Sequence, residues 1–228
     1  MPRLRRQYGA VRRFCNRKAA ALAAVLLLAA SPGWAEPLRL VALGDSLTQG
    51  YGLPPEDGFT AQLERWLAAQ GREVQVVNAG VSGDTTAGGR SRVGWALADG
   101  ADAMLVTLGG NDLLRGVDPS VSRDNLDAIL TEAAAQEVPV LLIAMEAPGN
   151  YGPDYRAAFD AIYPELAETH GVALAESFLA PLVEGTADGA AMRDFLQEDG
   201  LHPNAEGVAR IVEGLGPRVL ELIDTAAE

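Results

Sequence analysis

The sequence predicts an α/β fold in which a parallel sheet carries helices on both faces. Strand-like apolar runs recur along the chain at residues 38–43, 74–79, 103–108, 139–145 and about 172–176. Segments whose apolar residues follow helical spacing lie between these runs. Strands that alternate with helices form parallel sheets joined by right-handed crossovers, which leaves helices on both faces of the sheet.

Four helices are expected in detail. Residues 59–70 carry apolar side chains at helical spacing. Asp118 supplies an N-cap, and Pro119 a preset first turn, for the next helix. Residues 155–170 form the third helix, and Asn204 caps the last one. Glycine and proline should kink or break that last helix, at Gly214, Gly216 and Pro217.

Small polar residues follow the first three expected strands. Ser46 lies in Gly-Asp-Ser after the first strand, Gly83 in Ser-Gly-Asp-Thr after the second, and Asn111 in Gly-Gly-Asn-Asp after the third. The carboxyl ends of parallel strands meet at one edge of a sheet, where ligands bind. Ser46 is therefore a candidate nucleophile, while the Gly83 N–H and the Asn111 amide are donors suited to an oxyanion hole.

The sequence contains two histidines, and only one has the surroundings of a catalytic base. His202 follows Asp199 by three residues across a glycine turn. The carboxylate can therefore hold one ring nitrogen while the other accepts the Ser46 proton. His170 directly precedes Gly171, which is typical of the last turn of a helix, and we interpret it as structural. Each motif alone is also compatible with a turn or a helix cap, so the catalytic interpretation depends on their conjunction.

These four stretches resemble the four blocks of the SGNH hydrolases, also called GDSL esterases and lipases. The resemblance implies that Ser46, Asp199 and His202 form a catalytic triad. It also implies an oxyanion hole built from Ser46, Gly83 and Asn111. The implied fold is a three-layer α/β/α sandwich with five parallel strands in the order 2-1-3-4-5, a flavodoxin-like arrangement. No serine lies in Gly-x-Ser-x-Gly, the nucleophile elbow of the α/β-hydrolases.

The resemblance covers about residues 38–225, and two further stretches point to one branch of the family. Asn-Tyr-Gly at 150–152 and Ala-Ile-Tyr-Pro at 161–164 are similar to the bacterial periplasmic thioesterase I / protease I / lysophospholipase branch and its arylesterase relatives. This implies hydrolysis of aryl esters, short to medium acyl esters, thioesters and lysophospholipids, without a metal or cofactor. The loop from Met145 to Pro153 is expected to be a mobile wall of the acyl pocket, with Asn150 and Tyr151 as substrate-binding residues.

Three other functions were weighed. The alternative within the same family is a carbohydrate or cell-wall O-acetylesterase. An inactive binding module would use the same cleft, but intact Ser46, Asp199 and His202 count against it. A metal-dependent hydrolase is disfavoured because two distant histidines, with no cysteine in residues 36–228, offer no ligand spacing for zinc.

Residues 1–35 have the layout of a secretory signal peptide. Residues 1–18 are basic and contain no acid, residues 19–30 are apolar, and Gly33 and Ala35 are the small residues before a cleavage site. We therefore expect an exported protein, periplasmic or secreted, whose residues 36–228 form a single domain. The apolar run is shorter than the ~20 residues of a membrane span, so we expect no stable membrane anchoring after cleavage. Retention as an anchor is the alternative.

The expected mature chain is strongly acidic. Seven of the 18 basic residues lie in residues 1–35, so 11 remain against 31 acidic residues, which gives a net charge of −20. This charge disfavours binding to nucleic acid, to anionic membranes and to polyanionic substrates. Copies of such a chain also repel one another, so we expect a monomer whose partner is a small acyl ester.

Overall fold

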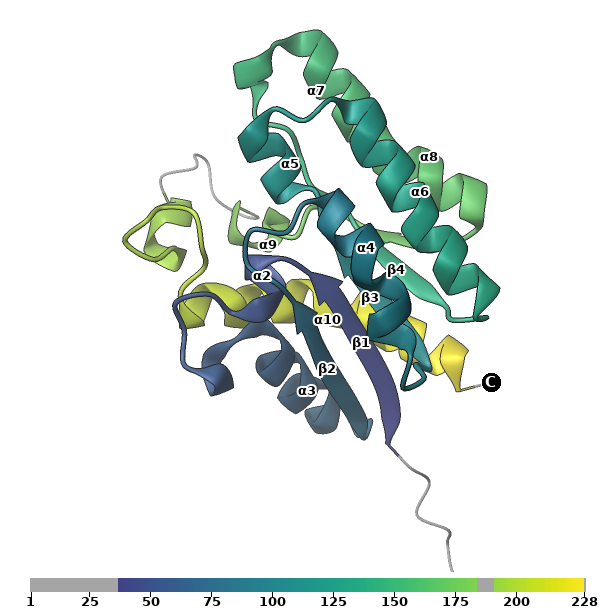
Figure 1. Ribbon diagram of the computed structural model, residues 1–228. Helices are drawn as coiled ribbons and strands as arrows, with labels where there is room; N and C mark the ends of the chain where they lie inside the picture. The colour runs from purple at the N-terminus through teal and green to yellow at the C-terminus, as the bar shows by residue number, and fades with distance from the viewer. Residues whose placement is uncertain (1–36, 184–190, 228) are drawn as a thin grey trace, which may run out of the picture. The chain divides into compact units, whose positions relative to one another are not determined.

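The computed structural model describes residues 37–183 and 191–227, and the expected signal peptide lies outside these residues. Five parallel strands form one sheet in the order β2-β1-β3-β4-β5. The predicted strand order is therefore confirmed (Figure 1). The strands are β1 (Leu38–Gly44), β2 (Val74–Gly80), β3 (Ala103–Thr107), β4 (Val140–Ile143) and β5 (Ala173–Ala175).

Helices cover both faces of the sheet, which confirms the three-layer α/β/α sandwich (Figure 1). On one face α3 (Phe59–Ala69) packs against α10 (Ala205–Ala226). On the other face α6 (Pro119–Ala135) lies between α4 (Thr86–Leu97) and α8 (Ile162–His170). Each of these helices buries apolar residues, as expected of helices that cover a sheet.

Several short elements complete the fold. Three of them directly follow strands: α2 (Ser46–Gln49) follows β1, and α5 (Gly110–Arg115) and η2 (Gly149–Tyr151) come after β3 and β4. They therefore lie at the carboxyl edge of the sheet, where ligands bind in such folds. The others are η1 (Pro55–Asp57), α7 (Pro153–Asp160), α9 (Ala180–Val183) and η3 (Ala191–Phe195).

The three central strands form the rigid part of the core. All residues of β3 and β4 are buried, as are the last five of β1. Burying one leucine side chain contributes about 1.5–3 kcal/mol, so residues such as Leu40, Leu105 and Leu142, none of them accessible to solvent, stabilise the sheet strongly. The polar loops that follow these strands are therefore attached to a rigid part of the structure.

Two helices differ from the sequence-based expectation. The single helix expected over residues 155–170 is divided into α7 and α8 at Ala161. Pro164 has no N–H to donate to the carbonyl of Asp160, and its ring displaces that carbonyl, which ends α7 there. By contrast, α10 continues through Pro217 and is not broken. The neighbouring buried residues Leu215 and Val219 show that tertiary packing outweighs the local cost of this proline.

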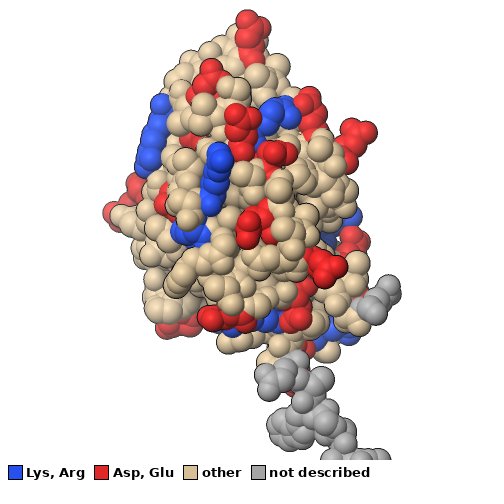
Figure 2. Space-filling view, turned by 45° about the vertical axis from the view of Figure 1, so that its right-hand side comes forward, with Lys and Arg blue, Asp and Glu red and all other residues tan. Residues whose placement is uncertain are grey.

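Acidic side chains are spread over the face of the molecule shown in Figure 2, with fewer arginines between them. This distribution agrees with the acidic composition of the sequence. Within residues 37–183 and 191–227, no helix combines the length and apolar character needed to cross a bilayer.

Candidate active site

Ser46 is the first residue of α2 and lies two residues after Gly44, the last residue of β1. Asp45 caps this short helix, because its Oδ1 accepts a hydrogen bond of 3.0 Å from the Leu47 N–H. The chain approaches closely here: a side chain on Gly80, at the end of β2, would collide with the backbone of Gln49 and Asp45. Glycine at this position therefore allows α2 to rest on the sheet edge and present the Ser46 hydroxyl.

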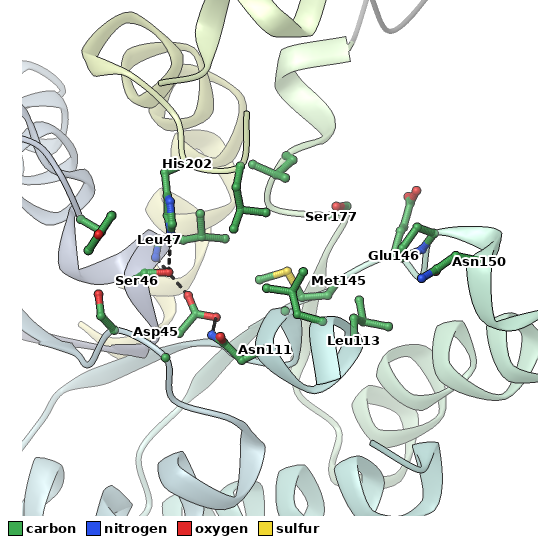
Figure 3. Close-up of a pocket in the computed structure, with 18 of the residues that line it drawn as sticks. Asp45, Ser46, Leu47, Asn111, Leu113, Met145, Glu146, Asn150, Ser177 and His202 are labelled. Carbon is green, nitrogen blue, oxygen red and sulfur yellow. Dashed lines mark hydrogen bonds between the residues drawn. The ribbon is translucent and has the colours of Figure 1, made fainter. Parts of the chain in front are cut away.

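A continuous chain of hydrogen bonds joins three of the predicted residues (Figure 3 shows its first link). The Nε2 atom of His202 lies 2.9 Å from the Oγ atom of Ser46. Its Nδ1 atom lies 2.6 Å from Oδ2 of Asp199. Because Asp199 precedes His202 by three residues, its carboxylate can bind the ring nitrogen that does not face Ser46, as predicted.

The Asp199 carboxylate is held in its ionised form. Its Oδ1 accepts hydrogen bonds from the backbone N–H groups of Leu201 and His202, at 2.9 and 3.0 Å. The N–H of His202, the imidazole and the N–H of Leu201, in that order, hold the pKa of Asp199 at about 2. An ionised carboxylate at this place fixes the imidazole tautomer that leaves Nε2 free to accept a proton.

Asn111 lies on α5, and its side-chain amide donates to Oδ2 of Asp45 at 3.1 Å (Figure 3). Asp45 is almost fully buried, and this burial raises its pKa, while the hydrogen bonds from Leu47 and Asn111 oppose the rise. Since an amide nitrogen carries two hydrogens, the bond to Asp45 fixes the plane of the amide and leaves the second hydrogen available.

Gly83 belongs to the loop between β2 and α4 and adopts a φ of 81°, a left-handed conformation that favours glycine. Its carbonyl accepts a hydrogen bond of 2.8 Å from the Arg115 guanidinium. Gly83 lines the same cavity as Ser46 and Asn111, so the three predicted donors are brought together at one edge of the sheet.

The cavity has a volume of about 500 Å³ and is lined mainly by apolar groups. Asn150 and Tyr151, the predicted substrate-binding residues, both lie in its wall. Tyr151 packs beside Tyr155, with ring centroids 5.0 Å apart, and covers Gly116. The apolar part of the wall is formed by Leu47, Tyr51, Leu113, Leu114, Met145, Pro148, Leu179 and Leu201.

The second histidine lies elsewhere. His170 is in the last turn of α8, as predicted, and the following Gly171 has a left-handed conformation. Its Nε2 lies 2.8 Å from Oδ1 of Asp127 on α6. It lines a separate hollow at the opposite, amino-terminal edge of the sheet, beside Val140 and Val172. Among the described residues, no group of three or more histidine, cysteine, aspartate or glutamate side chains is arranged to hold a metal ion.

Sequence reasoning missed two residues that contact the site. The ring of Tyr51 lies against the His202 imidazole, and the Gln197 side chain donates to the carbonyls of Tyr51 and Pro203. Gln197 is separated from Tyr51 by 146 residues, so no local pattern signals the contact. The only available signal is position, since Tyr51 stands in the turn that follows α2 and Gln197 just precedes Asp199.

Comparison with known proteins shows the family to which the chain belongs. Residues 42–210 match the model of the GDSL-like lipase/acylhydrolase family. The chain is 37% identical to the esterase TesA of Pseudomonas aeruginosa over 185 residues, which cover 81% of this chain and 89% of that protein. It is 34% identical to thioesterase 1/protease 1/lysophospholipase L1 of Escherichia coli, over 81% of this chain and 85% of that protein.

A solved structure shows the same similarity. The crystal structure of AlinE4, described as an SGNH-hydrolase family esterase, is 41% identical and superposes with a TM-score of 0.67. The match covers 83% of this chain and 98% of that one. The family expected from the four sequence blocks is thereby confirmed. The chain belongs to the GDSL-like lipase/acylhydrolase family, and it is a hydrolase that acts on ester bonds.

Proposed function

We propose that this protein is an exported serine esterase that cleaves acyl esters through an acyl-enzyme. The observation that carries the proposal is the hydrogen-bonded chain Ser46–His202–Asp199, with its links of 2.9 and 2.6 Å. Ser46 attacks the ester carbonyl while His202 removes its proton. The tetrahedral intermediate collapses, His202 protonates the departing alcohol, and water then repeats the cycle on the acyl-enzyme to release the acid.

The proposed oxyanion hole consists of the backbone N–H groups of Ser46 and Gly83 and the side-chain amide of Asn111. The presence of all three residues on one cavity supports these roles. The bond from Asn111 to the buried Asp45 supports them further, because it fixes the amide before substrate arrives. A donor that is already oriented stabilises the charge of the transition state without reorganisation.

The proposed substrates are aryl esters, short to medium acyl esters, thioesters and lysophospholipids. Support comes from the apolar lining of the cavity and from the names of the relatives, an esterase and a thioesterase/lysophospholipase. Asn150 and Tyr151 are proposed to contact the acyl chain. An acetyl group would occupy little of this apolar surface, so nothing in the cavity favours the O-acetylesterase alternative.

Residues 1–35 are proposed to be a signal peptide, which is removed to release a monomeric, single-domain enzyme of residues 36–228. The basic start, apolar run and small residues before Glu36 support this. Mass determination of the protein recovered from the exported fraction tests it. A mass that includes residues 1–35 would contradict cleavage.

Labelling with a fluorophosphonate tests the nucleophile. The mature protein is incubated with the reagent, and the modified residue is mapped by mass spectrometry. Labelling at Ser46 and loss of hydrolysis in Ser46→Ala are expected. Ser82 provides an internal control, because it lines the same cavity. Adducts at Ser82, or no adduct at all, would contradict the assignment.

A further inference from the structure

The Arg92 side chain is packed between the ends of two strands, with 17% of its surface exposed. Its guanidinium donates three hydrogen bonds. Nη2 donates to the carbonyl of Gly44 at 2.7 Å, and Nη1 to the carbonyl of Ala79 at 2.6 Å. Nε donates to Oδ2 of Asp84 at 2.7 Å. One side chain on α4 thus contacts the ends of β1 and β2 together with the loop that follows β2.

These three acceptors adjoin the residues proposed for catalysis. Gly44 is two residues before Ser46, and Asp84 is the residue directly after Gly83. The paired register of β1 and β2 ends at Gly44 and Gly80, just before both loops diverge from the sheet. Two of the Arg92 acceptors, Gly44 and Ala79, lie among these last paired residues, and the third, Asp84, lies beyond them. Arg92 therefore connects the ends of both strands to the loop that follows β2.

We propose that Arg92 is a positioning residue that sets the separation between the Ser46 nucleophile and the Gly83 oxyanion donor. This inference rests on the proposed roles of those two residues. A planar guanidinium presents several N–H groups in a fixed fork, so it can hold three acceptors at once. Asp84 balances the charge, which allows the group to sit in a largely buried place.

The proposal predicts a specific kinetic effect. In Arg92→Ala and Arg92→Lys, kcat should fall by about 10–100-fold, since a displacement of about 1 Å at the reacting centre has costs of this size. KM for a medium-chain ester should stay within about twofold, because most of the apolar wall comes from segments that Arg92 does not contact. The loss of a contact that matters only in the transition state lowers kcat and leaves KM nearly unchanged. Lysine offers a single donor atom, so it should not replace the fork.

Arg90 provides a matched control. It lies on the same helix, and its guanidinium donates to Oδ1 of Asn125 on α6, away from the strand ends. Arg90→Ala should keep kcat within about twofold of the wild type. Ethylguanidine added at millimolar concentration should restore part of kcat in Arg92→Ala and leave Arg90→Ala unchanged. A role limited to stability would not give this rescue.

The rate of fluorophosphonate labelling separates this inference from the proposed function. If the wild type is not labelled at Ser46, the proposed function itself fails. If the wild type is labelled and Arg92→Ala reacts at the same rate, the positioning role is wrong. It is also wrong if kcat stays within about twofold, or if only KM or Tm changes. Arg92→Lys keeps the positive charge and the aliphatic part of the side chain. If the alanine variant does not fold, the same measurements are made on the lysine variant.

Discussion

The aromatic ring of Tyr51 lies against the imidazole of His202, with ring centroids 4.7 Å apart and ring planes inclined by 39°. Tyr51 stands in the turn after α2, so the helix that presents Ser46 also brings this ring to the histidine. The Gln197 amide donates to the carbonyls of Tyr51 and Pro203 at 2.8 and 2.9 Å. The loop that carries the proposed base is thereby fastened to the loop that follows the proposed nucleophile.

Replacing this ring should weaken catalysis. During the reaction the imidazole becomes positively charged, and an aromatic face stabilises such a cation by ~0.5–1 kcal/mol at an exposed site. Tyr51→Ala should therefore lower kcat by about 2–5-fold, and Tyr51→Phe should preserve it, because phenylalanine keeps the ring. Steady-state kinetics with one p-nitrophenyl ester measures both. A phenylalanine variant as slow as the alanine variant would assign the effect to the hydroxyl instead.

Asn111→Ala should lower kcat by about 10²–10³-fold, as the loss of one oxyanion donor does in other hydrolases. Asp45→Asn is the matched comparison. It leaves Asn111 in place but replaces its carboxyl acceptor with an amide, so its loss should be smaller. Thermal unfolding shows whether both variants are folded. An Asn111→Ala enzyme with kcat within threefold of the wild type would make Asn111 a turn residue only.

The activity should rise with pH through a single ionisation. Only a neutral imidazole can accept the serine proton, so kcat/KM should increase as the pH rises from 5 to 8. Asp199 should not add a second step, because its hydrogen bonds hold its pKa at about 2 and keep it ionised over that interval. A profile that is flat from pH 5 to 8 would argue against His202 as the base.

The candidate site was predictable where sheet geometry determines position. Ser46, Gly83 and Asn111 each follow a strand, and a parallel sheet brings such positions to one edge whatever lies between them. Asp199 and His202 are near neighbours in the chain, so their contact is local. Tyr51 and Gln197 escaped prediction because their contact joins distant loops, and neither residue interrupts a hydrophobic pattern.

The strands of the fold were predictable from the sequence, whereas helix α4 was not. The strands stand out because the central ones are buried on both faces and read as continuous apolar runs. Helix α4 was not recognised, since three glycines lie within Thr86–Leu97 and glycine has low helix propensity. Its formation depends on packing against α6 and β1. The proposed positioning role of Arg92 likewise depends on where α4 lies in the fold, and no sequence pattern around Arg92 indicates it.

Tyr151 should influence the choice of acyl chain. Its hydroxyl lies 3.5 Å from the carbonyl of Leu114, and its ring covers Gly116, so it links two parts of the cavity wall. Tyr151→Ala should reduce kcat/KM for medium-chain esters more than for acetate esters, because only the longer chains reach this wall. A p-nitrophenyl ester series of increasing length measures the effect. Equal losses at every length would show that the Met145–Pro153 loop is only a connection.

The charge of the protein should also select among substrates. Residues 36–228 carry a net charge of −20, which repels a polyanion such as acyl-CoA, and added salt screens this repulsion. We therefore expect kcat/KM for acyl-CoA to rise with salt, while that for a neutral ester of equal chain length stays nearly constant.

Arginines near the cavity could attract acyl-CoA and so oppose the expected repulsion. Their contacts show that most of them are not available to do so. Arg92 is turned inward and paired with Asp84, and Arg90 donates to Asn125. Of the three arginines just beyond the second and third blocks, only Arg115 contacts a residue of the cavity wall, Gly83, within the part of the chain that the structure describes. One cation cannot offset the whole surface, so Arg115→Ala should change the salt dependence little. If the acyl-CoA rate instead falls with salt, and Arg115→Ala abolishes that fall, the site attracts anions locally and the expectation is wrong.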